Sequence, residues 1–205
     1  MMTLSQKLAD IRSGLVRFAR DESGSNTVEA MLMIPLFVWS FLACYVFFDA
    51  YRVQSINAKA GYTIGDIISR QQAYITPEFI DSMHNLQRSL VDSQTIPRLR
   101  VSTFVYDESS DEILVNWSEV RGGGDELTDA RLATMRPAIP DMYDGEIAIL
   151  VQTSVDYEPI FAAGVAQMDF DDFVITSPRV GQACFHPVNL GGNQATQDRE
   201  CVVGQ

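Results

Sequence analysis

The sequence has few of the side chains that catalytic and metal sites use. Its 205 residues include two histidines, His84 and His186, and three cysteines, Cys44, Cys184 and Cys201. Neither histidine has a second histidine, a cysteine or an acid at a spacing typical of metal ligands. Catalysis requires acids, bases and nucleophiles that are positioned together, and the sequence contains no recognisable set. It therefore predicts a protein without enzyme activity, cofactor or metal.

Basic residues are also scarce. The chain has 15 Lys and Arg against 27 Asp and Glu, for a formal net charge of −12. This balance argues against a nucleic-acid partner, because phosphate contacts need clustered Lys and Arg. The charge is uneven: residues 1–20 carry four basic side chains and one acidic, whereas residues 49–205 carry 11 basic and 23 acidic. A basic head and an acidic body indicate two different surroundings.

Charge is absent altogether from Ala30 to Phe48, a run of 19 residues. A helix of that length spans about 28 Å, close to the hydrocarbon core of a bilayer at about 30 Å. Lys and Arg cluster before the run, so we expect the N-terminus in the cytoplasm and the body exported. The length of the run, and the lack of a small-x-small cleavage site after it, favour a retained anchor over a secretory signal. Pro35 is expected to kink the helix.

The remaining patterns predict an α+β fold with three parts. Residues 1–23 form a cytoplasmic leader with a basic amphipathic helix, residues 24–49 the transmembrane helix, and residues 50–205 an exported domain. We expect the transmembrane helix to continue outward as an amphipathic stem, packed on a small antiparallel sheet. The expected helices are 50–72, 76–91, 125–136 and 158–167, and the expected strands are 99–106, 112–120, 145–157 and 172–180.

Three smaller features allow more than one interpretation. Cys184 and Cys201 lie 17 positions apart in a polar tail, and in an oxidising compartment we predict that they form a disulfide rather than remain two free thiols. Gly122–Gly124 lacks the Lys of a phosphate-binding loop and is interpreted as a flexible break. Asp169, Asp171 and Asp172 are interpreted as a solvated acidic turn rather than a calcium site.

The N-terminal motif resembles a known family. Residues 24–52, GSNTVEAMLMIPLFVWSFLACYVFFDAYR, are similar to the N-terminus of TadE-like proteins, the pseudopilins of the bacterial tight-adherence (Flp-type) pilus assembly system. The shared features are the Gly24-Ser25 opening, Glu29 at the start of the apolar helix, Pro35 within it and an aromatic-rich exit before Tyr51. The resemblance implies a pilin-like fold and a single-pass protein of the bacterial inner membrane, with a periplasmic domain.

The resemblance also implies processing and assembly. A membrane prepilin peptidase would cut after Gly24, leaving Ser25 as the new N-terminus and Glu29 as the fifth residue of the mature chain. Glu29 would then pair with the free amino group of an adjacent subunit, which offsets the cost of a carboxylate at the membrane edge. Ala30 follows Glu29 where the Flp-type motif favours Tyr. The implied partners are the peptidase, other pilins or pseudopilins, inner-membrane assembly proteins and the lipid bilayer.

Two alternatives to pilus assembly remain at this point. The first is a membrane-tethered periplasmic sensor or binding module, which has no need of Gly24 and Glu29 at their spacing. The second is a membrane-anchored hydrolase that uses Asp141, Asp144 or His186. For Glu29 itself, the simpler interpretation is that it marks the membrane boundary or favours the positive end of the helix.

Overall fold

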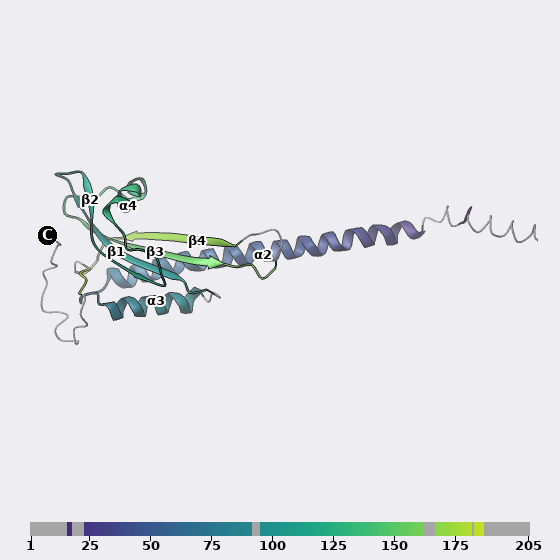
Figure 1. The fold of residues 1–205 in the computed structure, drawn as a ribbon, viewed down its shortest axis with the longest axis horizontal. Coiled ribbons are helices and arrows are strands. Elements are labelled where there is room, and N and C mark those ends of the chain that lie inside the picture. Colours follow the sequence, from purple (N-terminus) through teal and green to yellow (C-terminus); the bar gives the residue numbers. More distant parts are fainter. Residues whose placement is uncertain (1–15, 18–22, 92–94, 162–166, 182, 187–205) are drawn as a thin grey trace, which may run out of the picture.

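The protein is an α+β structure built around one very long helix. The computed structural model describes residues 16–17, 23–91, 95–161, 167–181 and 183–186, with residues 23–26 described by their backbone. Within these ranges the elements are, in chain order, α2 (Ser23–Ser69), α3 (Pro77–Val91), β1 (Arg98–Asp107), β2 (Glu112–Arg121), α4 (Asp129–Thr134), the 3₁₀ turn η1 (Arg136–Ala138), β3 (Ile147–Tyr157) and β4 (Met168–Thr176). The expected fold class is confirmed (Figure 1).

The four strands form one antiparallel sheet in the order β2-β1-β3-β4. The strands β1 and β2 form a hairpin whose register shifts between Thr103 and Phe104, and β3 and β4 form a second hairpin in which Tyr157 pairs with Met168. The strand β1 lies between β2 and β3, so it joins the two hairpins into one sheet.

Two helices cover one face of the sheet. The alternating side chains of β1 and β3 direct Leu99, Val101, Ile149 and Val151 toward α2 and α3, where they form a core with four helix residues, Ile64, Ile68, Ile80 and Met83. The opposite face carries a second core beneath α4 and its flanking loops, which includes Phe104, Leu132 and Leu150. Both faces of the sheet are therefore covered over much of its area, which explains the apolar content of β3.

The helix α2 is fastened to the sheet by close contacts and by one buried amide. The Asn57 Nδ2 atom donates hydrogen bonds of 3.2 Å to the backbone oxygens of Thr153 in β3 and Phe170 in β4. One and two turns further on, Gly61 and Gly65 lie close to side chains of the same strands, and a Cβ atom added at either glycine would be in ordinary van der Waals contact with them.

Several expected boundaries need correction. Residues 158–161 are not helical, and the strand expected at 172–180 begins at Met168, so Asp169, Asp171 and Asp172 lie in β4 rather than in a turn. The helix expected over 125–136 is limited to α4, which Thr128 caps by accepting a hydrogen bond from the Arg131 N–H. The helix α2 runs through Pro35 without interruption. The leader helix falls almost entirely outside the described residues.

Candidate membrane anchor and its junction with the domain

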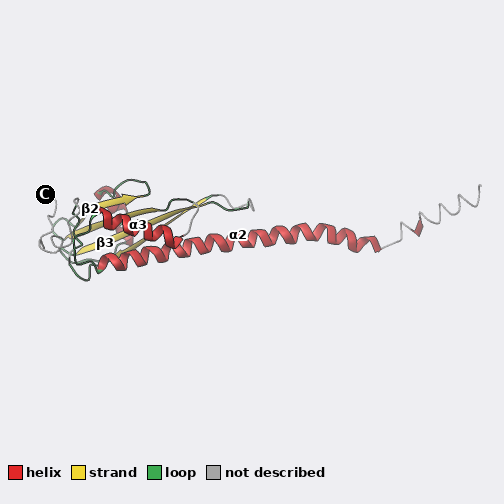
Figure 2. Ribbon diagram, turned by 90° about the horizontal axis from the view of Figure 1, so that it is seen from below, coloured by secondary structure: helices red, strands yellow, loops and turns green. Residues whose placement is uncertain are grey.

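The helix α2 has two halves with opposite surroundings. Figure 2 shows its N-terminal part extending well beyond the sheet, whereas its C-terminal part lies along it. Only 6% of the most apolar 18-residue window is buried inside the molecule, and among the described residues this is the one helix long and apolar enough to cross a membrane. Its exposed large side chains include Met31, Leu32, Ile34, Leu36, Phe37, Trp39, Phe41, Phe47 and Phe48. We call residues 27–48 the apolar half of α2.

The predicted processing and assembly residues lie at the start of this helix. Gly24 and Ser25 belong to the first turn of α2, and Glu29 follows on an exposed part of the helix. Gly24 is helical in the structure. The structure therefore places Gly24, Ser25 and Glu29 on one continuous helix, with Glu29 near the start of its apolar half.

The junction between the apolar half and the domain is closed by Tyr157, the last residue of β3. Its hydroxyl donates to the Asp49 carboxylate at 3.1 Å and lies 3.3 Å from the carbonyl oxygen of Val46. Val46 and Ala50 are buried at the same level. The end of the sheet thus contacts α2 where its uncharged run ends.

Burial and the contact with Asp49 both change the pKa of Tyr157. Burial, followed by the hydrogen bond to Asp49 and the negative charge of that carboxylate, raises the pKa of Tyr157 to about 12. The phenol is therefore neutral at physiological pH and remains a donor. Asp49 also lies 4.0 Å from Arg52, one turn further along α2. These polar groups define the edge of the apolar half.

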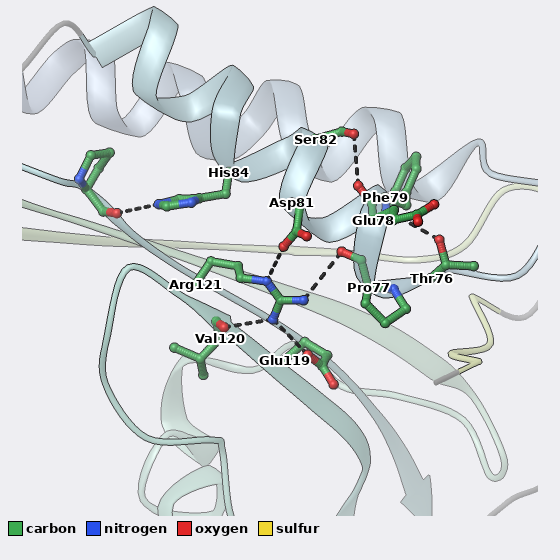
Figure 3. A network of polar contacts seen from close by, with 11 residues as sticks. Thr76, Pro77, Glu78, Phe79, Asp81, Ser82, His84, Glu119, Val120 and Arg121 are labelled. Atoms are coloured by element: carbon green, nitrogen blue, oxygen red, sulfur yellow. Dashed lines mark hydrogen bonds and ion pairs between the residues drawn. The ribbon is translucent and has the colours of Figure 1, made fainter. Parts of the chain in front are cut away.

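A polar network joins α3 to β2 at the other side of the molecule (Figure 3). Arg121 donates to the carboxylates of Asp81 and Glu119 and to the carbonyl oxygen of Pro77. Burial acts to lower the pKa of Arg121, but these hydrogen bonds and the two carboxylate charges together raise it. His84 Nε2 lies 2.8 Å from the carbonyl oxygen of Pro97. Arg121 and His84 are thus engaged in holding the fold together.

Gly122 has a structural role instead of the flexible one expected. It has a φ of +79°, and a Cβ atom on it would lie 2.3 Å from the carbonyl oxygen of Pro97 and 3.1 Å from His84 Nε2. Only glycine fits this conformation and this close approach.

The tail residues also serve the fold. Cys184 is disulfide-bonded and Cys44 is free, and the predicted partner Cys201 lies outside the described residues. The segment around Cys184 and Phe185 pairs with Ile75: the Ile75 N–H donates to the Cys184 oxygen at 2.7 Å, and Trp117 stacks on Phe185. A cysteine nucleophile or metal ligand at Cys184 is therefore not available. Among the described residues, no group of three or more His, Cys, Asp or Glu is placed to hold a metal ion.

An open pocket of 520 Å³ lies between α4 and the sheet face opposite α2. Arg98, Arg100 and Arg131 line it together with Asp125 and Asp171. Burial and the charge of Arg131 lower the pKa of Arg100, and the two aspartates act against that change.

Two of these arginines already form hydrogen bonds within the protein. Arg98 donates to Asp156 and Ser154, and Arg100 donates to the Gln152 amide and the Asp125 backbone oxygen. The pocket is a feature that the sequence did not predict. Its members come from all four strands, from α4 and the residue after it, and from the loop after β2, and nothing in their spacing along the chain brings them together.

Comparison with protein-family models, with curated proteins and with solved structures finds no significant match for this chain. The fold is an α+β structure in which an exposed apolar helix, long enough to cross a membrane, continues into a domain with a four-stranded antiparallel sheet.

Proposed function

We propose that this chain is a minor pseudopilin or membrane component of tight-adherence pilus assembly in bacteria. One observation carries the proposal: a single uninterrupted helix, α2, is apolar and largely exposed over residues 27–48 and buried against the sheet over much of the rest. A helix of this kind can pack with other helices in the membrane while it holds its domain outside. The N-terminal motif with Gly24, Ser25 and Glu29 agrees with this role.

The proposed mechanism uses the charge at the start of α2. Cutting after Gly24 by a prepilin peptidase removes the basic leader and leaves the α-amino group of Ser25 near the cytoplasmic membrane surface. Glu29 then pairs with the amino group of a neighbouring subunit. A carboxylate beside lipid is costly without a partner, so the pair favours one axial register between packed helices. The domain remains in the periplasm and contacts other pilins, pseudopilins or inner-membrane assembly proteins.

The test is a Glu29→Ala substitution in the full chain, expressed with the pilus assembly proteins. We expect the variant to remain in the membrane fraction, because the uncharged run is unchanged, but to be lost from co-purified assemblies. Glu29→Gln is the matched control for side-chain shape and should be lost as well. Incorporation of both variants at the normal level would contradict the proposal. Mass spectrometry of the mature N-terminus tests processing separately, because a chain that begins at Met1 is uncut.

A membrane-tethered binding module is the alternative, and the arginine-lined pocket is the observation that favours it. Replacement of residues 24–44 by an unrelated transmembrane helix, which keeps the contacts of Tyr45 and Val46 with the domain, distinguishes the two. A pseudopilin should lose its assembly partners when the helix is replaced. A binding module should keep its function with any anchor.

A further inference from the structure

Residues 158–161, which follow β3 and which we call the hairpin tip, expose apolar side chains next to the candidate anchor helix. Ile160 is 60% exposed and Phe161 is 45% exposed, although both follow directly from a strand that is largely buried. The ring of Phe161 packs edge-on against Tyr45 of α2, with 6.4 Å between ring centroids. Among the labelled strands in Figure 1, β3 and β4 extend furthest along α2 toward its N-terminal half. The hairpin therefore contacts the helix where it leaves the domain.

The position of Tyr45 gives the depth of this contact. Tyr45 belongs to the uncharged run and precedes Asp49 by four residues, which is about 6 Å along a helix. Tyr157 contacts Asp49 at the polar edge, and Phe161 lies beyond it, beside Tyr45. If α2 crosses a bilayer, Phe161 lies deeper in the membrane than Asp49, the first charged residue after the uncharged run. Tyrosine and other aromatic rings are favoured at this depth.

The amino-acid sequence that connects β3 to β4 agrees with an apolar environment. No charged residue occurs between Glu158 and Asp169. Connections exposed to water are usually polar, and exposed apolar side chains that cluster mark a contact with a partner or a membrane. The Phe161 ring contacts Tyr45 in the apolar half of α2, so the exposed apolar surface of that half continues onto the hairpin tip.

We propose that the tip of the β3–β4 hairpin enters the outer edge of the bilayer that α2 crosses, with Ile160 and Phe161 in contact with lipid acyl chains. This inference rests on the proposed membrane anchoring. It gives the domain a second attachment to the membrane beside the helix. A domain held at two points has a fixed rotation about the helix axis, and it presents the same face to its partners.

The experiment measures the surroundings of a fluorescent label in proteoliposomes that contain the full chain. The free thiol is first removed by Cys44→Ala, and the disulfide of Cys184 is kept by working without reductant. An NBD label is then attached at one of three positions, by Ile160→Cys, Phe37→Cys or Ser110→Cys. Phe37 lies in the apolar half of α2, and Ser110 lies at the exposed turn between β1 and β2. Quenching is compared between a nitroxide on the lipid acyl chain and iodide in the buffer.

We expect the labels at 37 and 160 to be quenched more strongly by the lipid nitroxide, and the label at 110 by iodide. A label at 160 that iodide quenches as it does at 110, while 37 remains in lipid, would overturn the hairpin insertion and leave the anchor intact. A label at 160 that neither agent reaches would also overturn it, because a protein surface then covers the tip. Iodide quenching at 37 would instead contradict the membrane anchor itself. A Phe161→Cys label repeats the measurement where the Ile160→Cys variant folds poorly.

Discussion

Single residues far apart in the chain close the junction between the anchor and the domain. Asp49 and Tyr157 are 108 positions apart, and their side chains meet because β3 ends at the level where the uncharged run of α2 ends. The sequence indicates the charge-free run and the strand, but it does not indicate how far the strand reaches along the helix. The roles of Gly24 and Glu29 could be predicted from the sequence because their spacing is local, and they stay predictions. The contacts of Tyr157 and Phe161 could not be predicted, since they depend on the docking of sheet and helix.

Substitution of Tyr157 by Phe tests the junction through its pH dependence. The pKa of Tyr157 is raised to about 12 in the folded protein, whereas a tyrosine in the unfolded chain titrates at about 10. The neutral phenol is thus favoured by folding, and its contribution to stability is present below pH 10 and lost as the pH rises toward 12. In a titration of phenolate absorbance, the difference between wild type and Tyr157→Phe should have its midpoint near 12.

The same variant gives a second readout. Between pH 10 and 12, the free energy of unfolding of the wild-type protein should fall more than that of Tyr157→Phe, because the variant has no phenol to ionise. A difference titration with a midpoint near 10 would show that the contact with Asp49 does not persist in solution.

At the level of elements, the sequence predicts most of the structure where its periodicity is strong. The stem helix, α3, β1, β2 and β3 fall close to their expected ranges, because each has a clear apolar stripe or alternation. The strand β4 was placed four residues too late, since it is an edge strand whose first residues are exposed and acidic. Charged residues on an edge strand discourage pairing with other chains. They also conceal the strand pattern in the sequence.

The packing of α2 on the sheet predicts the effect of Gly65→Ala. A Cβ atom at Gly65 would meet side chains of β3 and β4 no closer than 3.7 Å, which is ordinary van der Waals contact. Alanine favours the helix by reducing the freedom of the unfolded chain, so the free energy of unfolding should rise by about 0.5–1 kcal/mol. Urea denaturation of the detergent-solubilised chain measures the change.

Two further substitutions serve as controls for Gly65→Ala. At Gly61 an added Cβ would lie 3.4 Å from the Thr153 hydroxyl, so alanine there should give a smaller gain. Gly65→Leu should destabilise the protein, because its larger side chain does not fit between helix and sheet. A loss of stability in Gly65→Ala itself would mean that the helix lies closer to the sheet than the contacts at Gly65 indicate.

At the scale of the whole molecule, the chain divides into an apolar helical segment whose side chains are exposed and a domain that buries its own apolar side chains. The apolar half of α2 exposes its large side chains, whereas the remainder of α2 supplies Ala60, Ile64 and Ile68 to the cores of the domain. Composition alone indicated this division, through the basic head, the uncharged run and the acidic body. Composition does not predict the strand order, because β1 pairs with β3 although β2 and α4 separate the two strands in the sequence.

This division predicts that a chain of residues 45–205 folds without a membrane. The domain contacts α2 from Tyr45 onward, and this chain keeps the Tyr157 junction and the buried Asn57. It loses most of the exposed apolar side chains, so we expect a monomer in detergent-free buffer with one cooperative thermal transition. A chain of residues 60–205 is the matched control and should melt at a lower temperature, because it lacks Asn57 and the Asp49 contact. Size-exclusion chromatography and circular dichroism, on protein produced in an oxidising compartment, measure both. Aggregation or an unfolded spectrum for residues 45–205 would mean that the domain needs the apolar half of α2 to fold. The division into an anchor and an independently folding domain would then be wrong.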